Sequence, residues 1–283
     1  MNGEDIFEAA RAANRSAAAP LAVAWDIETA ALAGSDEDAA RYDLPIACAG
    51  TLASEGGALT WQGPLAPDAP DGPFAPAMTR DGVREMLLYL LTARAQGATV
   101  VSFNGLGFDF PIAGARGHCH ALARDLALGH VDIMFAFHCA FGFPVGLARI
   151  AQAMGLGEKE GLSGQYAPCM WTGTGPDETR EHLVAEGHAP GTRAAQETVL
   201  RYVAGDVALT LAVYHAILAA GGKMAWTTRG GGVAKRTLPL IDAGDERLPR
   251  FPTVAECLEM PEPDVSWMSD PWPRAKFAGW LEG

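Results

Sequence analysis

Hydrophobic and polar positions divide the chain into short apolar runs and longer stretches with helical spacing. The apolar run 20–29 is typical of a buried strand, and strand patterns at 44–54 and 58–63 follow it. A Gly-Gly pair between the last two favours a turn, so the three strands are predicted to form a meander. The connector 64–78 carries too many prolines for either regular element.

Helices and strands are predicted to alternate after this meander. A Thr cap and apolar residues at helical spacing predict a helix from Thr79 to Gly97. The other predicted elements are a strand at 98–105, a broken helix at 111–129, a strand at 130–137, a helix at 146–156, an irregular stretch at 157–193 and the longest helix at 192–222. This order indicates a mixed α/β fold.

The domain organisation follows from the same pattern. We expect one domain at 20–222, preceded by an Ala-rich lead-in at 1–19 that forms a short helix or a loose end. Residues 223–283 contain several prolines and four tryptophans, and we expect an irregular extension that packs on the domain rather than a second core.

Composition and charge limit the classes of function. Hydrophobic residues make up 49% of the 283 and charged residues 19%, which indicates a globular chain with a well-buried core. The net charge of −13 argues against a general DNA-coating or membrane-surface protein, because its mean field repels polyanions. Nucleic acid would have to be met locally, through a small basic patch or bound cations.

Cysteine use and the N-terminus predict a cytoplasmic protein. The cysteines are odd in number and lack a CxxC pair, which is typical of reduced thiols. The N-terminus has early acids and no apolar segment, and no stretch reaches the ~18 uninterrupted apolar residues of a membrane span. The five cysteines are Cys48, Cys119, Cys139, Cys169 and Cys257.

Three separate stretches place acids where burial is expensive. Asp26 and Glu28 share one face of the first strand, where they could form a cation site or could simply face water. Asp109 follows a buried strand, where it could cap the next helix. Tyr202 and Asp206 lie one turn apart on the long helix, where they could form a buried hydrogen-bonded pair.

Taken in order, these stretches resemble a known family. The motifs DIE, NGLGFD and YVAGD match the three motifs of the DEDD 3′–5′ exonuclease superfamily, in its Tyr-containing DEDDy branch. The second motif is especially similar to that of the proofreading domains of family-B DNA polymerases. The branch rests on Tyr202, four residues before Asp206, since the His-containing branch would have histidine in place of Arg201. The resemblance covers about residues 20–220 and implies a ribonuclease H-like fold with a mixed five-stranded sheet.

The resemblance also implies a mechanism. Asp26, Glu28 and Asp206 would hold one divalent ion, Mg²⁺ or Mn²⁺, and Asp26, with Asp109 directly or through water, would hold a second. Tyr202 would orient the attacking water. Two such ions ~3.5–4 Å apart activate water and stabilise both oxygens of an in-line displacement. The implied product is a nucleoside 5′-monophosphate released from a 3′ end.

The implied substrate is single-stranded DNA or RNA. Asn104 and Phe108 belong to the second motif and would lie near the terminal nucleotide, although Asn104 could be a turn residue and Phe108 could be core. Lys159 follows the helix 146–156 and is a further candidate contact. An idle nucleic-acid-binding or partner-docking module on the same fold is the alternative, and a structure-specific endonuclease is a third possibility.

Other patterns leave alternatives open. Histidines and cysteines in GHCH and FHC do not have the spacing of a recognised zinc site. Asp132 could be a strand-end acid near the metals or a loop cap. Residues 227–236, TTRGGGVAKR, could contact a nucleic-acid backbone or form a solvated linker. The three tail tryptophans could stack on bases, but packing is their more common use.

Overall fold

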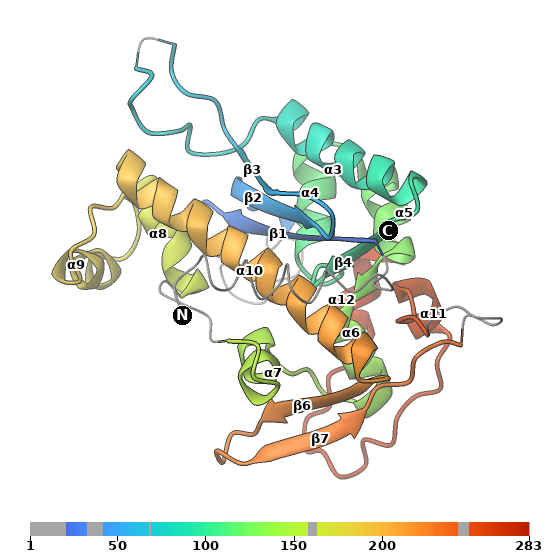
Figure 1. Cartoon of the computed structure of the whole chain (residues 1–283). Helices are drawn as coiled ribbons and strands as arrows, with labels where there is room; N and C mark the ends of the chain where they lie inside the picture. The colour runs from blue at the N-terminus through green and yellow to red at the C-terminus, as the bar shows by residue number, and fades with distance from the viewer. Residues whose placement is uncertain (1–20, 33–41, 68, 158–162, 243–248, 283) are drawn as a thin grey trace.

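The core of the fold is one mixed sheet. The computed structural model describes residues 21–32, 42–67, 69–157, 163–242 and 249–282. The sheet has the order β3-β2-β1-β4-β5, with β1 antiparallel to β2, β2 antiparallel to β3, and β1, β4 and β5 parallel (Figure 1). This confirms the predicted meander and the mixed five-stranded sheet. The strands are β1 (Ala22–Thr29), β2 (Ile46–Ala53), β3 (Ala58–Gln62), β4 (Thr99–Ser102) and β5 (Val131–Asp132).

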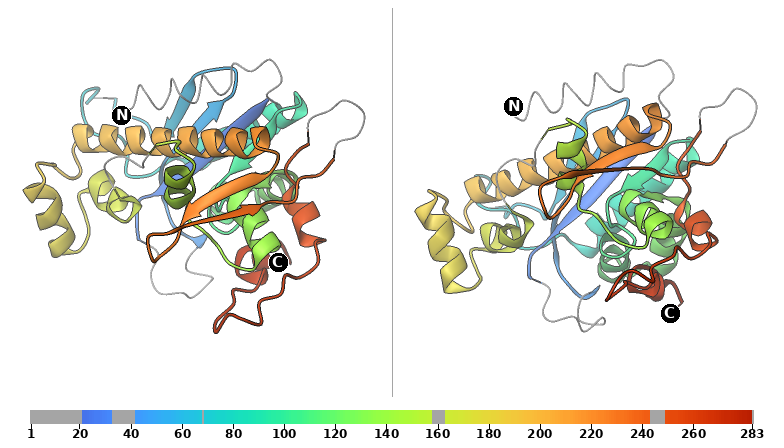
Figure 2. Two further views of the ribbon diagram at one scale, coloured as in Figure 1. Left: turned by 60° about the horizontal axis from the view of Figure 1, so that its bottom comes forward. Right: turned by 90° about the horizontal axis from the view of Figure 1, so that it is seen from below.

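Helices cover both faces of this sheet. Helix α10 crosses one face, and α3, α4 and α5 lie on the other (Figures 1 and 2). Thr79 caps α3 as predicted, with its hydroxyl accepting a 3.0 Å hydrogen bond from the Gly82 amide. These helices are α3 (Arg80–Ala95), α4 (Asp109–Arg116), α5 (His120–Gly129) and α10 (Arg193–Ala219).

Two predicted segments are wrong in part. The predicted strand 130–137 ends after two residues, because the Asp132 carboxylate accepts a 3.0 Å hydrogen bond from the Phe135 amide and starts helix α6 (Ile133–Phe141). The stretch 157–193 also contains regular structure. It holds a 3₁₀ turn, η1 (Gly164–Tyr166), and two helices, α8 (Ala167–Thr172) and α9 (Asp177–Ala185). The helix predicted at 146–156 is confirmed as α7 (Leu147–Ala153).

The C-terminal segment packs on the sheet domain. Its elements are β6 (Lys223–Thr227), β7 (Val233–Thr237), α11 (Val254–Leu258), α12 (Ala275–Ala278) and η2 (Gly279–Glu282). Phe251, Val254 and Phe277 are buried in the same hydrophobic cluster as Trp25 of β1. The segment thus packs as expected. The domain limits stay a prediction, and the lead-in 1–19 lies outside the described residues.

All five cysteines are free thiols in the described structure, and their reduced state in the cell stays a prediction. Four of the five are buried, and Cys119 is partly exposed. The cytoplasmic location stays a prediction.

Helix α10 lies unusually close to the sheet. A Cβ atom on Gly50 of β2 would lie 3.2 Å from the Val203 carbonyl oxygen, so the helix backbone passes directly over this glycine. The helix is long and apolar enough to cross a membrane, but 78% of its most apolar window is buried inside the protein. Because Gly50 pairs with Asp26 across the sheet, this close contact brings the middle of α10 over the acidic end of β1.

Candidate metal centre

Three carboxylates converge where β1 meets α10. Asp26, Glu28 and Asp206 each offer an oxygen, and these atoms all lie within 4.8 Å of one another. Asp206 is 7% exposed. Three negative charges at this separation repel strongly unless a cation or proton lies among them. Hard divalent cations such as Mg²⁺ and Mn²⁺ prefer carboxylate oxygens, so the donor set fits the predicted metal.

A fourth acid lies next to this trio. Asp109 is 2% exposed, accepts a 2.9 Å hydrogen bond from the Ile27 amide, and is in hydrogen-bonding contact with the Asp26 side chain. Burial, as the largest cause, raises the pKa of Asp109 to about 7. The charge of Asp132 also raises this pKa, whereas the hydrogen bond from Ile27 lowers it. The carboxylates therefore need a shared proton or a cation to coexist.

Asp109 does not cap the helix it begins. It is the first residue of α4, whose N-cap is Phe108, and no side chain caps this helix. The alternative interpretation of Asp109 as a helix cap is therefore wrong. Its carboxyl points back to β1 instead.

Tyr202 lies one turn before Asp206 on the same side of α10, as predicted. The side chain is buried, and a Cβ atom on Gly164 would lie 3.2 Å from its hydroxyl oxygen. The segment that follows α7 therefore returns to the tyrosine and covers it. Its hydroxyl lies beside the turn η1 rather than free in solvent.

Asp132 organises the loop that leads to Asp109. Its two oxygens accept hydrogen bonds from the amides of Asn104 (3.0 Å) and Leu106 (2.9 Å), in addition to the bond from Phe135. Asn104 adopts a φ of 74°, a left-handed conformation that asparagine tolerates better than most residues. Asp132 is thus a loop cap, and it is also the strand-end acid of the other alternative, since it ends β5 and its charge raises the pKa of Asp109.

A second anchor of this loop has no signal in the sequence. The Gly105 amide donates to Ser102 Oγ (3.1 Å), which lies 2.9 Å from His130 Nε2. His130 Nδ1 lies 2.6 Å from the Ala127 carbonyl, which can only accept, so Nδ1 carries the proton and Nε2 accepts from the serine. Burial lowers the pKa of His130 to about 3, which keeps the ring neutral. A Cβ atom on Gly105 would overlap Ser102 Oγ.

The C-terminal segment is the third anchor. Trp280 Nε1 donates a 2.7 Å hydrogen bond to the Leu106 carbonyl. Phe277 is 3% exposed, and a Cβ atom on Gly107 would lie 3.2 Å from its ring. No local pattern links residue 280 to residue 106, so these contacts could not be predicted.

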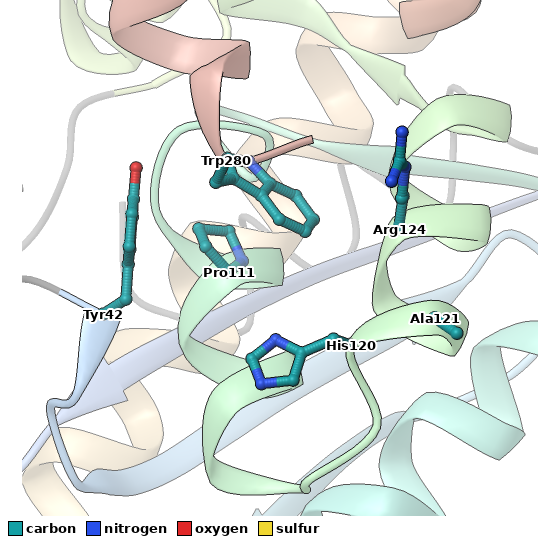
Figure 3. Close-up of a pocket in the computed structure, with 6 residues that line it drawn as sticks. All are labelled: Tyr42, Pro111, His120, Ala121, Arg124 and Trp280. Atoms are coloured by element: carbon teal, nitrogen blue, oxygen red, sulfur yellow. The ribbon is translucent and has the colours of Figure 1, made fainter. Parts of the chain in front are cut away.

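Trp280 also borders a pocket of about 560 Å³. In Figure 3 its indole lies opposite His120, with Tyr42 and Arg124 on either side. None of the four carboxylates lines this pocket. Pro111 does, because it lies about 200° around α4 from Asp109. The pocket is therefore separate from the acidic site.

The remaining predicted site residues are the candidate substrate contacts Asn104, Phe108 and Lys159. Asn104 and Phe108 flank the loop before Asp109, and Phe108 is partly buried against the core. Their contact with substrate stays a prediction, and Lys159 lies outside the described residues. Among the residues that the structure describes, the acidic trio is the one group of three or more metal-binding side chains, and the GHCH histidines are not part of it.

Comparison with known proteins identifies the family. The model of the RNase H superfamily matches residues 74–218, just over half of the chain. No curated protein matches. Forty-nine chains of solved structures match, among them the family B DNA polymerase from the hyperthermophilic archaeon Pyrobaculum calidifontis. That match has 18% identity and a TM-score of 0.45, and covers 70% of this chain and 24% of the polymerase chain. On the family match, the chain belongs to the RNase H superfamily.

Proposed function

We propose that this chain is a metal-dependent 3′–5′ exonuclease of the DEDDy type that acts on single-stranded DNA or RNA. The convergence of Asp26, Glu28 and Asp206, with Asp109 against Asp26, carries the proposal. Membership of a superfamily that includes many nucleases supports a nucleic-acid-processing role. The order of the three sequence motifs supports the exonuclease branch.

Each acidic residue has a role in this proposal. Asp26, Glu28 and Asp206 hold one divalent ion, and Asp26 with Asp109 holds a second. Bound ions of this kind lower the pKa of water and stabilise the entering and leaving oxygens of the phosphodiester. Tyr202 orients the attacking water through its hydroxyl. Asp132 and His130 act only by fixing the backbone of the loop that carries Asp109.

The activity can be tested with oligonucleotides that report direction. A 16-nucleotide single strand labelled at its 3′ end should release labelled mononucleotide at once, in Mg²⁺ or Mn²⁺ but not in EDTA. The same strand labelled at its 5′ end should shorten one nucleotide at a time. Matched DNA and RNA strands then determine the sugar preference, which rests on contacts to the 2′-OH.

Two controls separate this function from the alternatives. Asp26→Asn should abolish release, whereas Asp177→Asn on the exposed surface of α9 should leave it unchanged. Wild-type activity in Asp26→Asn would refute the metal assignment, and absence of any release by the wild type would favour an idle binding module. Cleavage of a circular single strand would instead indicate an endonuclease.

A further inference from the structure

The basic stretch between β6 and β7 is a folded arm and not a linker. β6 and β7 pair antiparallel from Lys223 with Thr237 to Thr227 with Val233. A 2.8 Å hydrogen bond from the Thr228 amide to the Gly232 carbonyl closes the turn. Of the two alternatives for this stretch, the solvated linker is therefore wrong.

The hairpin is firmly attached to the domain. Trp226 is buried, with its ring centroid 5.1 Å from that of Phe137 and 6.0 Å from that of Phe143. Thr227 Oγ1 donates a 3.0 Å hydrogen bond to Gln152 of α7. Figure 1 shows β6 running back beneath α10 toward α7. Charges on the hairpin thus have fixed positions relative to the acidic site.

The charge of this arm is opposite to that of the whole chain. Residues 207–241 contain no Asp or Glu, in a chain of net charge −13. All four cations in the segment are exposed, and among the described residues none makes an ion pair. These cations are Lys223, Arg229, Lys235 and Arg236.

Two of the cations lie on one face of the hairpin. Lys235 pairs with Ala225, and Lys223 is two residues from Ala225, so the two lysines are diagonal neighbours. Such neighbours are about 7–8 Å apart, where like charges repel unless an anion lies between them. The phosphates of a nucleic-acid backbone supply such anions in a row, and binding them requires no pocket for a base.

We propose that the β6–β7 hairpin binds backbone phosphates of the single strand whose 3′ end lies at the carboxylates. This inference rests on the proposed function and adds the surface that holds the rest of the substrate. Exposed cations along a strand track a nucleic-acid backbone without reading its sequence. They also provide the local attraction that an acidic protein needs for a polyanion.

The hairpin should matter only for longer strands. Helix α10 continues 13 residues beyond Asp206, about 20 Å, before β6 turns back. Lys223 at the start of β6, and Lys235 beside it, are therefore separated from the carboxylates by about this length of helix. A strand of about four nucleotides occupies the carboxylate site alone, whereas a 16-nucleotide strand reaches both.

The test measures binding in EDTA, so that it does not depend on hydrolysis. Fluorescence anisotropy with labelled 4- and 16-nucleotide oligo(dT) and oligo(rU) gives the dependence of log K on log salt concentration. The double variant Lys223→Gln/Lys235→Gln should lower the slope for the 16-mer by about 1.4, since each single-strand phosphate contact contributes about 0.7. Arg229→Gln, in the turn, should lower it by about 0.7 and serves if the double variant does not fold.

The controls keep the inference separate from the exonuclease activity. Arg80→Gln removes the same charge from exposed α3 and should leave the slope unchanged. Metal-dependent hydrolysis of the 4-mer should be equal in the wild type and the double variant. A normal slope in the double variant, no measurable binding by the wild type, or equal competition by polyglutamate would overturn the proposal. Loss of the exonuclease activity alone, with the slope change present, would refute only the proposed function.

Discussion

The indole of Trp280 donates a 2.7 Å hydrogen bond to the carbonyl of Leu106, and so joins the C-terminal segment to the loop before Asp109. The two residues are 174 positions apart in the chain. Together with Phe277, which packs on Gly107, this contact makes the tail part of the support of the acidic site.

Trp280→Phe tests this support. A smaller aromatic ring replaces the indole and the Leu106 carbonyl loses its donor, which should cost about 1–3 kcal/mol in the free energy of unfolding. If the tail positions Asp109, kcat for mononucleotide release should fall several-fold while KM changes little. Trp267→Phe is the matched control, because this side chain is 67% exposed and its indole donates only to the nearby Asp264 carbonyl. A destabilised variant with normal kcat would show that the tail supports only the fold.

Gly50→Ala tests the close approach of α10. The new methyl group would lie 3.2 Å from the Val203 carbonyl oxygen, so the helix that carries Asp206 must shift. We expect a loss of about 1–3 kcal/mol in the free energy of unfolding and a lower rate of hydrolysis. Gly57→Ala, at a position with nothing within 4 Å, should affect neither. Equal behaviour of the two variants in urea unfolding and in the nuclease assay would contradict this account.

Tyr202→Phe removes one hydroxyl and little else. Because the hydroxyl is proposed to orient the attacking water, kcat should fall about a hundredfold, which is within the range for a positioned proton-transfer group. Metal binding and the unfolding midpoint should remain close to those of the wild type. Steady-state kinetics with the 3′-labelled strand measure the effect. Unchanged kcat would remove Tyr202 from the mechanism and the chain from the DEDDy branch.

His130 should make stability depend on pH. Its folded pKa is about 3, whereas the unfolded residue binds a proton below about pH 6.5. Between these values the unfolded state binds more protons, so stability falls as the pH drops. At pH 5 the loss amounts to about 2 kcal/mol relative to pH 7.5.

Urea unfolding of His130→Gln at both pH values isolates this contribution. The variant should be less stable than the wild type at pH 7.5, because Ser102 loses its partner, but it should lose less stability on acidification. His118→Gln, at an exposed histidine, should follow the wild-type profile. Parallel profiles for the wild type and His130→Gln would show that the buried ring does not titrate as described.

The sequence predicted those parts of the site that depend on local periodicity. Asp26 and Glu28 share a strand face and Tyr202 and Asp206 share a helix face, and the structure has both pairs. The convergence of the trio followed from the order of the motifs. The prediction of a strand at 130–137 was wrong in part, because a short apolar run fits either a strand or a buried helix. The cap from Asp132 starts a helix here instead.

Other parts of the site have no local signal. The chain from Gly105 through Ser102 to His130 joins two strand ends that the sequence separates by 28 residues, and the Trp280 contact spans a longer separation. Gly50 appears in the sequence as one more small residue within a strand. Its role follows only from the helix that lies on it.

The most direct test of the central claim is a calorimetric titration of the protein with Mn²⁺. We expect saturable binding that rises to two ions per chain when a nucleoside 5′-monophosphate, the proposed product, is present, and that is lost in Asp206→Asn but kept in Asp177→Asn. If Mn²⁺ did not bind, or bound Asp206→Asn as it binds the wild type, the account of the four carboxylates as a metal centre would be wrong.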